Sequence, residues 1–352
     1  SHAGIAGLDT VTHQCGVHVM HSMGYTFALE RFLNEREPAT AIIVGAGYVG
    51  LEMSEAFTVR GLAVTQIQRG PEVLSTLDPD LGAIVHTELV DHGVEILTNT
   101  TVTSIEKTDR GVTVTGVRDD AIVARTADVV LVVVGVRPNT DLLERAGARR
   151  GSGRAVVVDE SMRTGLPNVW AAGDGVITHH RLLGETYLPL GTTSHKQGRT
   201  AGENAVGGSA RFAGSVGTQV VKVFDLVAAR TGLRDHEALA IGREPLTTSA
   251  VADDHKRYYP GAQPITIRIT GDERDGRLLG AQLVGRLGTE TAKRVDTYAT
   301  ALFGGLTVQQ VSDLDLSYTP PLGSPWDAVQ IATQQWSRTR AAVDCQSQET
   351  NA

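Results

Sequence analysis

The sequence predicts an α/β protein built on a parallel sheet, followed by a smaller α+β module. Three observations predict this class. An apolar run at 41–44 leads through a glycine-rich segment into a helical pattern at 51–57, which is the order of a βαβ unit. The six apolar residues at 129–134 are typical of a strand that is buried in a parallel sheet. Beyond Gly214 strand patterns precede helical ones, which indicates an α+β arrangement.

The part of the chain before residue 136 carries the elements of the parallel sheet. Between 102 and 115, apolar and polar residues alternate around the turn residues 109–111, which predicts an antiparallel meander. The other expected elements are, in chain order, a strand at 16–20, a helix at 25–34, the βαβ unit from 39 with its second strand at 63–67, a helix at 80–92, and strands at 94–97 and 129–134.

The second half of the chain shows weaker patterns. A helix is expected at 192–206, because Gly207-Gly208 supplies a stop signal. The polar stretch 338–352 has little to bury and is expected to fray. The other expected elements are a helix after 139, a Gly/Arg-rich connector at 147–154, strands at 155–158, 169–172, 219–224, 264–270 and 278–284, and helices at 288–302 and 307–313.

The glycine-rich segment indicates a dinucleotide site because it stands between a strand and a helix. Gly45 would allow a tight turn, Gly47 the approach of a pyrophosphate, and Gly50 close packing of the helix on the strand. The unpaired N–H groups of the helix would then face the phosphates. The alternative is a glycine turn with no ligand. The candidate loop residues are Gly45, Ala46, Gly47, Tyr48, Val49 and Gly50.

The end of the strand at 63–67 bears on the choice of nicotinamide cofactor. An NAD site usually has Asp or Glu here, which accepts hydrogen bonds from the ribose. This chain has Gln68 and Arg69 instead, and a guanidinium suits the 2′-phosphate of NADPH. The sequence therefore favours NADPH and leaves NADH open, since Arg69 is equally well explained as a solvated surface residue.

Composition and charge exclude several classes of protein. The chain has 352 residues, enough for two or three domains, and a net charge of −8. It has no long basic run, so nucleic-acid and anionic-membrane binding are not expected. No apolar run approaches the length needed to span a bilayer.

Cysteine and histidine usage predicts no metal site. The two cysteines, Cys15 and Cys345, are too far apart in sequence to suggest a disulfide framework, and a reducing cytoplasm is the simplest setting. His179 and His180 have no further ligands at metal-binding spacing, so we expect solvated loop histidines. The acidic and histidine residues at 253–255 are likewise expected to form a polar loop.

Three segments resemble the FAD-dependent pyridine nucleotide–disulfide oxidoreductases. They are 43–52 (IVGAGYVGLE), 135–139 (GVRPN) and 168–174 (NVWAAGD), and they occur in the family's order and spacing. The resemblance covers nearly all of the chain from residue 4 to about residue 331. Two further segments, 257–261 (RYYPG) and 316–321 (LSYTPP), look like those of coenzyme A-disulfide reductases, as does the strand ending at Arg69.

The resemblance implies a Rossmann-type NAD(P)-binding domain inserted in a partial FAD-binding domain, with a C-terminal α+β dimerisation domain. The implied domains are 1–36, a remnant of the FAD-binding domain; 37–153, the NAD(P)-binding domain; 154–210, the second part of the FAD-binding domain; 211–336, the dimerisation domain; and 337–352, a polar tail.

The resemblance also implies which residues contact the cofactors. Asp174 would accept hydrogen bonds from the ribityl chain of FAD, beside the backbone of Gly173. Thr192 and Thr193 would open a helix whose N-terminus faces the flavin. Gly135 and Val136 belong to the matched GVRPN segment and are candidates for the nicotinamide cofactor. Asp174 could instead be a turn residue.

Five residues are candidates for catalysis or for the nicotinamide pocket. Glu52 matches a glutamate that pairs with a lysine beside the flavin in relatives, and Tyr48 a residue that covers the nicotinamide pocket. Tyr318 and one of Tyr258 and Tyr259 would reach the partner subunit's active site and donate hydrogen bonds to the substrate or a thiolate. The alternatives are a carboxylate that complements the helix dipole for Glu52, and ordinary packing for the tyrosines.

The activity implied is reduction of a small disulfide, with coenzyme A disulfide favoured, by hydride transfer to FAD in a homodimer. The family's FAD loop and redox-active cysteine are absent from this sequence, and neither Cys15 nor Cys345 stands in that cysteine's place. We therefore expect a further N-terminal segment. The alternatives are an NADH oxidase, a peroxidase or a polysulfide reductase of the family, a relative of ferredoxin reductases, and a truncated nucleotide-binding dimer without turnover.

Overall fold

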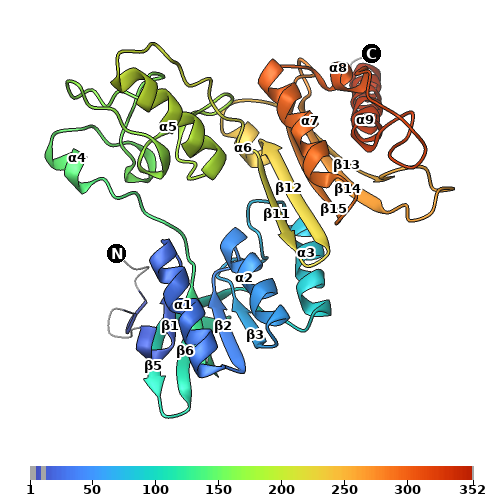
Figure 1. Cartoon of the computed structure of the whole chain (residues 1–352). Helices are drawn as coiled ribbons and strands as arrows, with labels where there is room; N and C mark the ends of the chain where they lie inside the picture. The colour runs from blue at the N-terminus through green and yellow to red at the C-terminus, as the bar shows by residue number, and fades with distance from the viewer. Residues whose placement is uncertain (1–4, 9–12, 351–352) are drawn as a thin grey trace. The chain divides into compact units, whose positions relative to one another are not determined.

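The computed structural model describes residues 5–8 and 13–350, with only the backbone of His13 and of 344–350 (Figure 1). The chain divides into two compact units. Unit 1 holds the described residues up to Val136 together with Val220–Ala228 and Val284–Leu287, and unit 2 holds the remainder. Parts of the predicted 1–36 segment and the last residues of the predicted tail lie outside the described residues.

Unit 1 is built on a five-stranded sheet in the order β1-β8-β2-β3-β4 (Figure 1). All four neighbouring pairs are parallel, as the sequence predicts. The strands are β1 (Val17–Val19), β2 (Thr40–Val44), β3 (Ala63–Ile67), β4 (Glu95–Leu97) and β8 (Val129–Val132). A short 3-10 turn, η1 (His13–Cys15), and three helices accompany them: α1 (Met23–Arg36), α2 (Tyr48–Val59) and α3 (Pro79–Asp91).

The predicted meander forms a separate three-stranded antiparallel sheet, β5 (Thr100–Thr108), β6 (Gly111–Arg118) and β7 (Ala121–Ala127). It covers one face of the parallel sheet, because Ile105 and Val112 share a core cluster with Ile42 and Val130. The sequence pattern located its turn and its first two strands.

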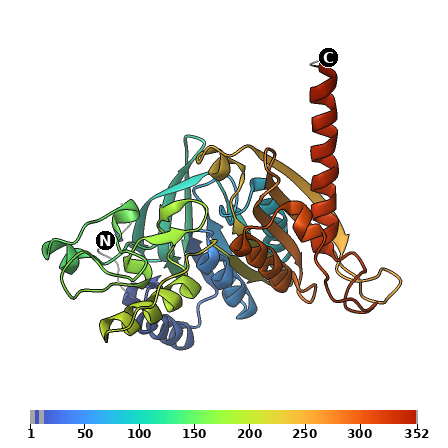
Figure 2. The same ribbon diagram turned by 90° about the horizontal axis from the view of Figure 1, so that it is seen from above.

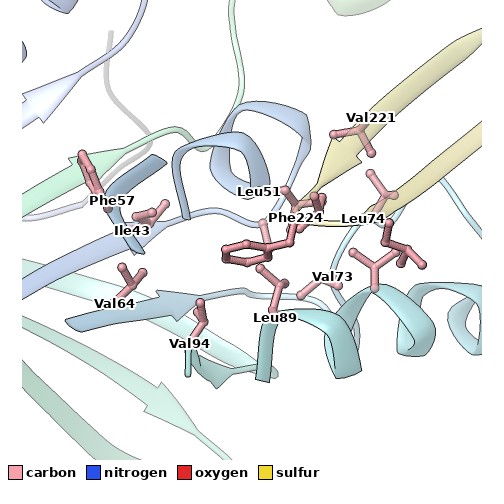
Figure 3. Packing of buried hydrophobic residues seen from close by; sticks show 14 of the residues in the cluster. Ile43, Leu51, Phe57, Val64, Val73, Leu74, Leu89, Val94, Val221 and Phe224 are labelled. Carbon is pink, nitrogen blue, oxygen red and sulfur yellow. The ribbon is translucent and has the colours of Figure 1, made fainter. Parts of the chain in front are cut away.

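The opposite face of the parallel sheet packs against α2 and α3. Ile43 of β2 belongs to this second cluster, since successive residues of a strand point to opposite faces. Phe224, from the segment between two later strands, completes it. Figure 3 shows the Phe224 ring beside Leu51 of α2 and Leu89 of α3. Residues distant in sequence thus close the hydrophobic core of unit 1.

Unit 2 contains most of a second five-stranded sheet, in the order β11-β12-β15-β14-β13. Its strands are β11 (Gln219–Val223), β12 (Leu226–Gly232), β13 (Pro245–Asp253), β14 (Pro264–Asp272) and β15 (Leu278–Arg286). The helices that follow are α7 (Thr291–Gly304), α8 (Val308–Ser312) and α9 (Ala328–Thr350). Tyr298 of α7 and Trp336 of α9 share a core cluster with Ile267 of β14.

The rest of unit 2 consists of shorter elements. The longest helix among these remaining elements is α5 (Gly191–Ala205). It ends shortly before Gly207, whose φ is 95°, as the sequence predicts. The remaining elements are α4 (Asp141–Arg145), η2 (Ser152–Arg154), η3 (Gly173–Gly175), the antiparallel pair β9 (Thr178–His180) and β10 (Gly184–Thr186), and α6 (Asp235–Leu239).

Two predicted strands do not form. At 155–158 and 169–172 the described backbone makes only single bridges, of Val156 with Arg150 and Val176 and of Trp170 with Arg163. Each segment therefore lacks a neighbouring strand along its length, which a ladder requires. Conversely, β12, β13 and α6 were not predicted, because their sequences lack a clear alternation or helical repeat.

The C-terminal tail also differs from the prediction. Instead of fraying from 338, α9 continues as one helix to Thr350, as Figure 2 shows. Trp336 anchors its first half by donating from Nε1 to the carbonyl of Leu246 at 2.7 Å. Beyond it the sequence is rich in Ala, Gln and Arg, which favour helix even when exposed. None of the described helices is long and apolar enough to cross a membrane.

Candidate functional site

The glycine-rich loop joins β2 to α2, and its three glycines differ in what a side chain at each position would meet. Gly45 has a φ of 107°, and a Cβ there would lie 2.7 Å from the carbonyl oxygen of Val133. A Cβ on Gly50 would lie 2.0 Å from the oxygen of Gly45, so α2 packs directly on the loop. A Cβ on Gly47 would meet nothing within 4 Å. Only Gly47 faces open space, where a ligand could approach the backbone.

The predicted nicotinamide residues gather at one edge of the sheet of unit 1. Gly45, Gln68 and Gly135 each follow the carboxyl end of one of the neighbouring strands β2, β3 and β8. The chain order reverses at β2, since β3 lies on one side of it and β8 on the other. In open α/β sheets this is where ligands bind. Gly135 has a φ of 106°, and Val136 beside it is exposed.

Two glutamines, one in β3 and one directly after it, hold the loop in place. Gln68 accepts from the N–H of Ala46 at 3.2 Å through Oε1 and donates to the carbonyl of Glu72 at 3.4 Å. Gln66 is fully buried; it donates to the carbonyl of Gly45 at 3.2 Å and accepts from the hydroxyl of Ser54 at 3.0 Å. Gln66 was missed, although an amide in a strand of a buried parallel sheet was the available signal.

Arg69 is exposed at the end of β3 and has no hydrogen bond or ion pair with the described residues. Gln68 fills the position of the usual carboxylate and is already bonded to the protein. The site thus has a cation and no acidic group where the adenosine ribose would lie. The choice of NADPH over NADH stays a prediction.

Tyr48 and Glu52 lie on the first turns of α2. The hydroxyl of Tyr48 is 3.1 Å from that of Thr76, and its ring packs on the core of unit 1. The pKa of Glu52 is raised by burial and by the charge of Glu55. Within the described part of the chain no lysine pairs with Glu52, whereas Lys222 pairs with Glu55. The flavin-side role of Glu52 therefore stays a prediction.

In unit 2, Asp174 lies beside the first turn of α5. Its Oδ1 accepts from the hydroxyl of Ser194 at 2.8 Å, and its other carboxylate oxygen makes no hydrogen bond with the described residues. Gly173 has a φ of 79° and donates its N–H to Gln197 at 3.0 Å. Tyr187 donates to the Asp174 carbonyl at 3.1 Å. Burial, and then the charge of Asp174, raise the pKa of Tyr187.

The start of α5 has no side-chain cap and no acidic residue in its first turn. Thr192 is exposed there and Thr193 is buried. Free N–H groups beside the open oxygen of Asp174 suit a ligand that carries both hydroxyl and anionic groups. The helix was predicted, but Ser194, Gln197 and Tyr187 were missed, because only the fold brings them to Asp174.

The structure brings together two of the three candidate tyrosines. Tyr258 lies in the loop after β13 and Tyr318 in the segment before α9, and both side chains are exposed. The backbone N–H of Lys256 donates to the carbonyl of Pro320 at 3.3 Å and joins the two segments. Burial, followed by a hydrogen bond with Tyr258, raises the pKa of Tyr318. Tyr259 lies next in the loop, also exposed.

The two adjacent histidines differ, and for His180 the prediction of a solvated loop is wrong. His180 ends β9 and is buried, and its Nδ1 accepts from the N–H groups of Leu182 and Leu183, both at 3.2 Å. Burial lowers the pKa of His180 to about 4. It is therefore a neutral residue that closes a turn, whereas His179 is exposed.

A cluster of Glu88, His92 and Asp225 in unit 1 has ligand atoms within 4.8 Å of one another. Glu88 is buried, and its two oxygens accept from Arg286 at 2.5 Å and from the N–H of Asp225 at 3.2 Å. The ring of His92 stacks on Phe224 at 3.8 Å. The cluster therefore holds Phe224 against α3, and the carboxylate of Glu88 is already paired with Arg286.

The chain belongs to the pyridine nucleotide-disulphide oxidoreductase family. The family pattern matches residues 14–198, and that of the family's dimerisation domain matches residues 218–328. This confirms the resemblance seen in the GAGYVG, GVRPN and NVWAAGD segments and the predicted class of fold.

Two of the relatives carry names that refer to sulfur compounds. The chain is 35% identical over 306 residues to the NAD(P)H sulfur oxidoreductase (CoA-dependent) of Pyrococcus abyssi, covering 86% of this chain and 67% of the relative. It is 27% identical over 318 residues to the coenzyme A disulfide reductase of Staphylococcus haemolyticus, covering 90% and 70%. It thus spans about two thirds of the length of these relatives.

A solved structure shares the fold. The NAD-dependent persulfide reductase of A. fulgidus has a TM-score of 0.87 and 34% sequence identity to this chain. The likeness covers 93% of this chain and 60% of that one. The family's arrangement therefore extends through both compact units described above.

Proposed function

We propose that this protein is an FAD-dependent NAD(P)H oxidoreductase that reduces a small disulfide or persulfide, with coenzyme A disulfide as the favoured acceptor. The observation that carries the proposal is that the segments of Tyr258 and Tyr318 lie side by side, joined by the hydrogen bond from Lys256 to Pro320, in a chain that also has an open phosphate loop. A redox-active cysteine that this sequence does not contain is part of the proposal.

The residues present fit both cofactors. Gly47 leaves the loop backbone open for the pyrophosphate of NADPH, and Arg69 stands free for a 2′-phosphate. Asp174 offers a carboxylate oxygen to the ribityl hydroxyls, and the uncapped start of α5 favours negative charge on the ring. When bound, FAD would pass electrons from the nicotinamide to the sulfur acceptor.

The tyrosine pair would act on the sulfur side of the reaction. A disulfide that is split leaves a thiolate, and hydrogen-bond donors aimed at that sulfur stabilise its charge. A tyrosine hydroxyl is protonated at neutral pH, so Tyr318 can donate. In a homodimer formed through the dimerisation domain, the pair would serve the partner's acceptor site. The cysteine usage fits a reducing cytoplasm.

The first experiment asks whether the purified chain holds flavin. A flavin absorption band that bleaches on addition of NADPH is the expected result. A colourless protein that still binds NADPH would support the alternative of a nucleotide-binding dimer without turnover. NADPH consumption is then followed with coenzyme A disulfide and, separately, with oxygen alone. Faster consumption with oxygen alone would refute the assignment of the acceptor and favour an oxidase.

The second experiment tests the tyrosines. Tyr318→Phe removes one hydrogen-bond donor and is expected to slow disulfide reduction about 10²-fold or more while flavin reduction by NADPH stays near normal. The control is Tyr25→Phe, which changes a similarly exposed tyrosine on α1 that has no assigned role. Equal losses in both half-reactions would mean that Tyr318 has only a structural role.

A further inference from the structure

Arg294 of α7 is a buried arginine whose fork joins three separate segments of unit 2. Nη2 donates to the carboxylate of Asp327 at 2.8 Å and to the backbone carbonyl of Asp254 at 2.7 Å. Nε donates to the same carboxylate at 3.1 Å, and Nη1 donates to the carbonyl of Thr289. Its side chain is 8% exposed. These contacts occupy most of the guanidinium's donors.

The contact at Asp254 fixes the loop that carries Tyr258. Asp254 and Gln263 close the base of this loop. The backbone N–H of Asp254 donates to the carbonyl of Gln263 at 3.0 Å, and the backbone N–H of Gln263 donates to the Asp254 carboxylate at 2.8 Å. The ring of His255 spans the loop, with Nδ1 3.0 Å from the Asp254 carboxylate and Nε2 3.3 Å from the carbonyl of Pro260. The sequence predicts a polar loop at 253–255, and within this stretch the structure buries Asp254.

The contact at Asp327 fixes the segment that carries Tyr318. Asp327 stands just before α9, and its Oδ1 accepts from the N–H of Val329 at 2.9 Å. The same carboxylate takes both Nε and Nη2 of Arg294. One side chain therefore anchors the start of one tyrosine segment and the end of the other.

We propose that Arg294 is the positioning residue that holds Tyr258 and Tyr318 next to each other, through Asp254 and Asp327, for the reduction proposed above. The inference rests on that proposed function for its catalytic consequence, but not for the geometry. Each tyrosine is itself exposed, and a single backbone hydrogen bond, from Lys256 to Pro320, joins the two segments directly. Their relative position therefore depends on anchors at the ends of the segments.

A lysine at this place could not do the same. The lysine ammonium is a compact charge and lacks the planar fork of arginine. It therefore cannot donate two parallel hydrogen bonds to the Asp327 carboxylate and also reach the carbonyl of Asp254. Arg294→Lys would keep the charge opposite Asp327 and release Asp254 or loosen Asp327. The tyrosine segments would then move apart.

The test compares Arg294→Lys with Arg230→Lys in the whole chain. Arg230 is a matched control: it is equally buried and donates to the Glu237 carboxylate at 2.7 Å and to the Gly232 carbonyl at 2.6 Å, two partners that lie outside the tyrosine segments. NMR of the tyrosine Cζ carbons follows the titration of Tyr318, which Tyr318→Phe identifies. This readout needs no cofactor and no acceptor.

The raised pKa of Tyr318 is expected to persist in Arg230→Lys and to fall toward the ordinary tyrosine value in Arg294→Lys. His255→Ala removes only the strut across the loop and is expected to give a smaller fall in the same direction, which covers the case that Arg294→Lys does not fold. An unchanged titration in a folded Arg294→Lys, or an equal change in Arg230→Lys, would overturn the proposal.

Activity is the second readout. Arg294→Lys is expected to lower kcat for disulfide reduction about 10²-fold while the KM for NADPH stays unchanged, because a small misplacement of a positioned group costs this much. This assay needs the protein with the redox-active cysteine that is part of the proposed function. If that protein reduces no disulfide at all, the proposed function fails, and the titration of the chain described above still decides whether Arg294 positions the tyrosines.

Discussion

At the scale of single residues, the glycine loop at 45–50 is explained more by the space around each residue than by the residue type. The three glycines of the loop look alike in sequence, yet Gly45 needs its positive φ, Gly50 needs the absence of a Cβ, and Gly47 needs neither. The glutamines of β3 then hold this backbone without contributing a charge. The residue that leaves open space is the one that a ligand would use.

This difference separates stability from binding. Gly50→Ala puts a methyl group 2.0 Å from a backbone oxygen and should lower the free energy of unfolding by about 1–3 kcal/mol. Gly47→Ala meets no atom and should cost about 1 kcal/mol or less, while it weakens NADPH binding by occupying the pyrophosphate's approach. Denaturant unfolding and calorimetric titration with NADPH measure the two effects. Equal losses of stability would contradict this assignment.

Arg69 decides the cofactor in our proposal, and its replacement tests this. Arg69→Glu places a carboxylate at the ribose and repels a 2′-phosphate, so preference should move toward NADH by about tenfold or more. The ratio of dissociation constants for NADPH and NADH gives the answer. The control is Arg60→Glu, which makes the same change of charge at an exposed arginine at the end of α2. An unchanged ratio in Arg69→Glu would make Arg69 an ordinary surface residue.

At the scale of elements, buried polar groups fix how turns and helices meet. His180 accepts two backbone N–H groups at the turn after β9, and Arg294 joins α7 to two loops. Neither role follows from the local sequence, since both depend on partners that lie in other elements or on burial. Of these two groups, His180 makes the stability of unit 2 depend on pH.

His180 gives a specific pH dependence. Its pKa falls from 6.5 to about 4 on folding, because burial disfavours the imidazolium. The unfolded chain therefore binds more protons, so the stability that neutral His180 contributes is present above 6.5 and is lost as the pH falls toward about 4. Between these values His180→Asn should flatten the decline of unfolding free energy with falling pH by up to about 1.4 kcal/mol per pH unit.

Urea unfolding at several pH values measures that slope. Asparagine retains an acceptor near the position of Nδ1 but does not titrate, so the slope reports protonation rather than the lost ring. His179→Asn, at the exposed neighbouring residue, should leave the slope as it is. A slope that is equally steep in all three proteins would show that other groups cause the decline.

At the scale of the whole molecule, the dimerisation domain implies a homodimer. Large apolar side chains in this domain are exposed in the segments around the tyrosine pair, among them Leu322 and Trp326. Several exposed large apolar side chains within one segment are typical of a surface that another protein covers. The observation fits a twofold contact in which each tyrosine pair serves the other subunit.

A single charge should break this contact if it lies in the interface. Leu322 is 77% exposed, and Leu322→Asp is expected to convert a dimer into a monomer in sedimentation velocity. Ile122→Asp is the matched control, because Ile122 is 79% exposed in β7 of unit 1 and is not in the dimerisation domain. A parent chain that sediments as a monomer, or a Leu322→Asp variant that stays dimeric, would contradict the expectation.

The parallel sheet, its glycine loop and the family can be predicted from the chain, because they depend on local patterns: runs of apolar residues, a loop in a fixed order, and short motifs at fixed spacing. Three contacts are visible only in the fold: Phe224 closes the core of unit 1, Ser194 holds Asp174, and Arg294 anchors both tyrosine segments. These contacts join residues that are distant in sequence or owe their meaning to burial. Periodicity in the sequence does not show which segment will lie beside another. For that reason the strands at 155–158 and 169–172 are predicted from their apolar residues but do not form, because no neighbouring strand runs along them.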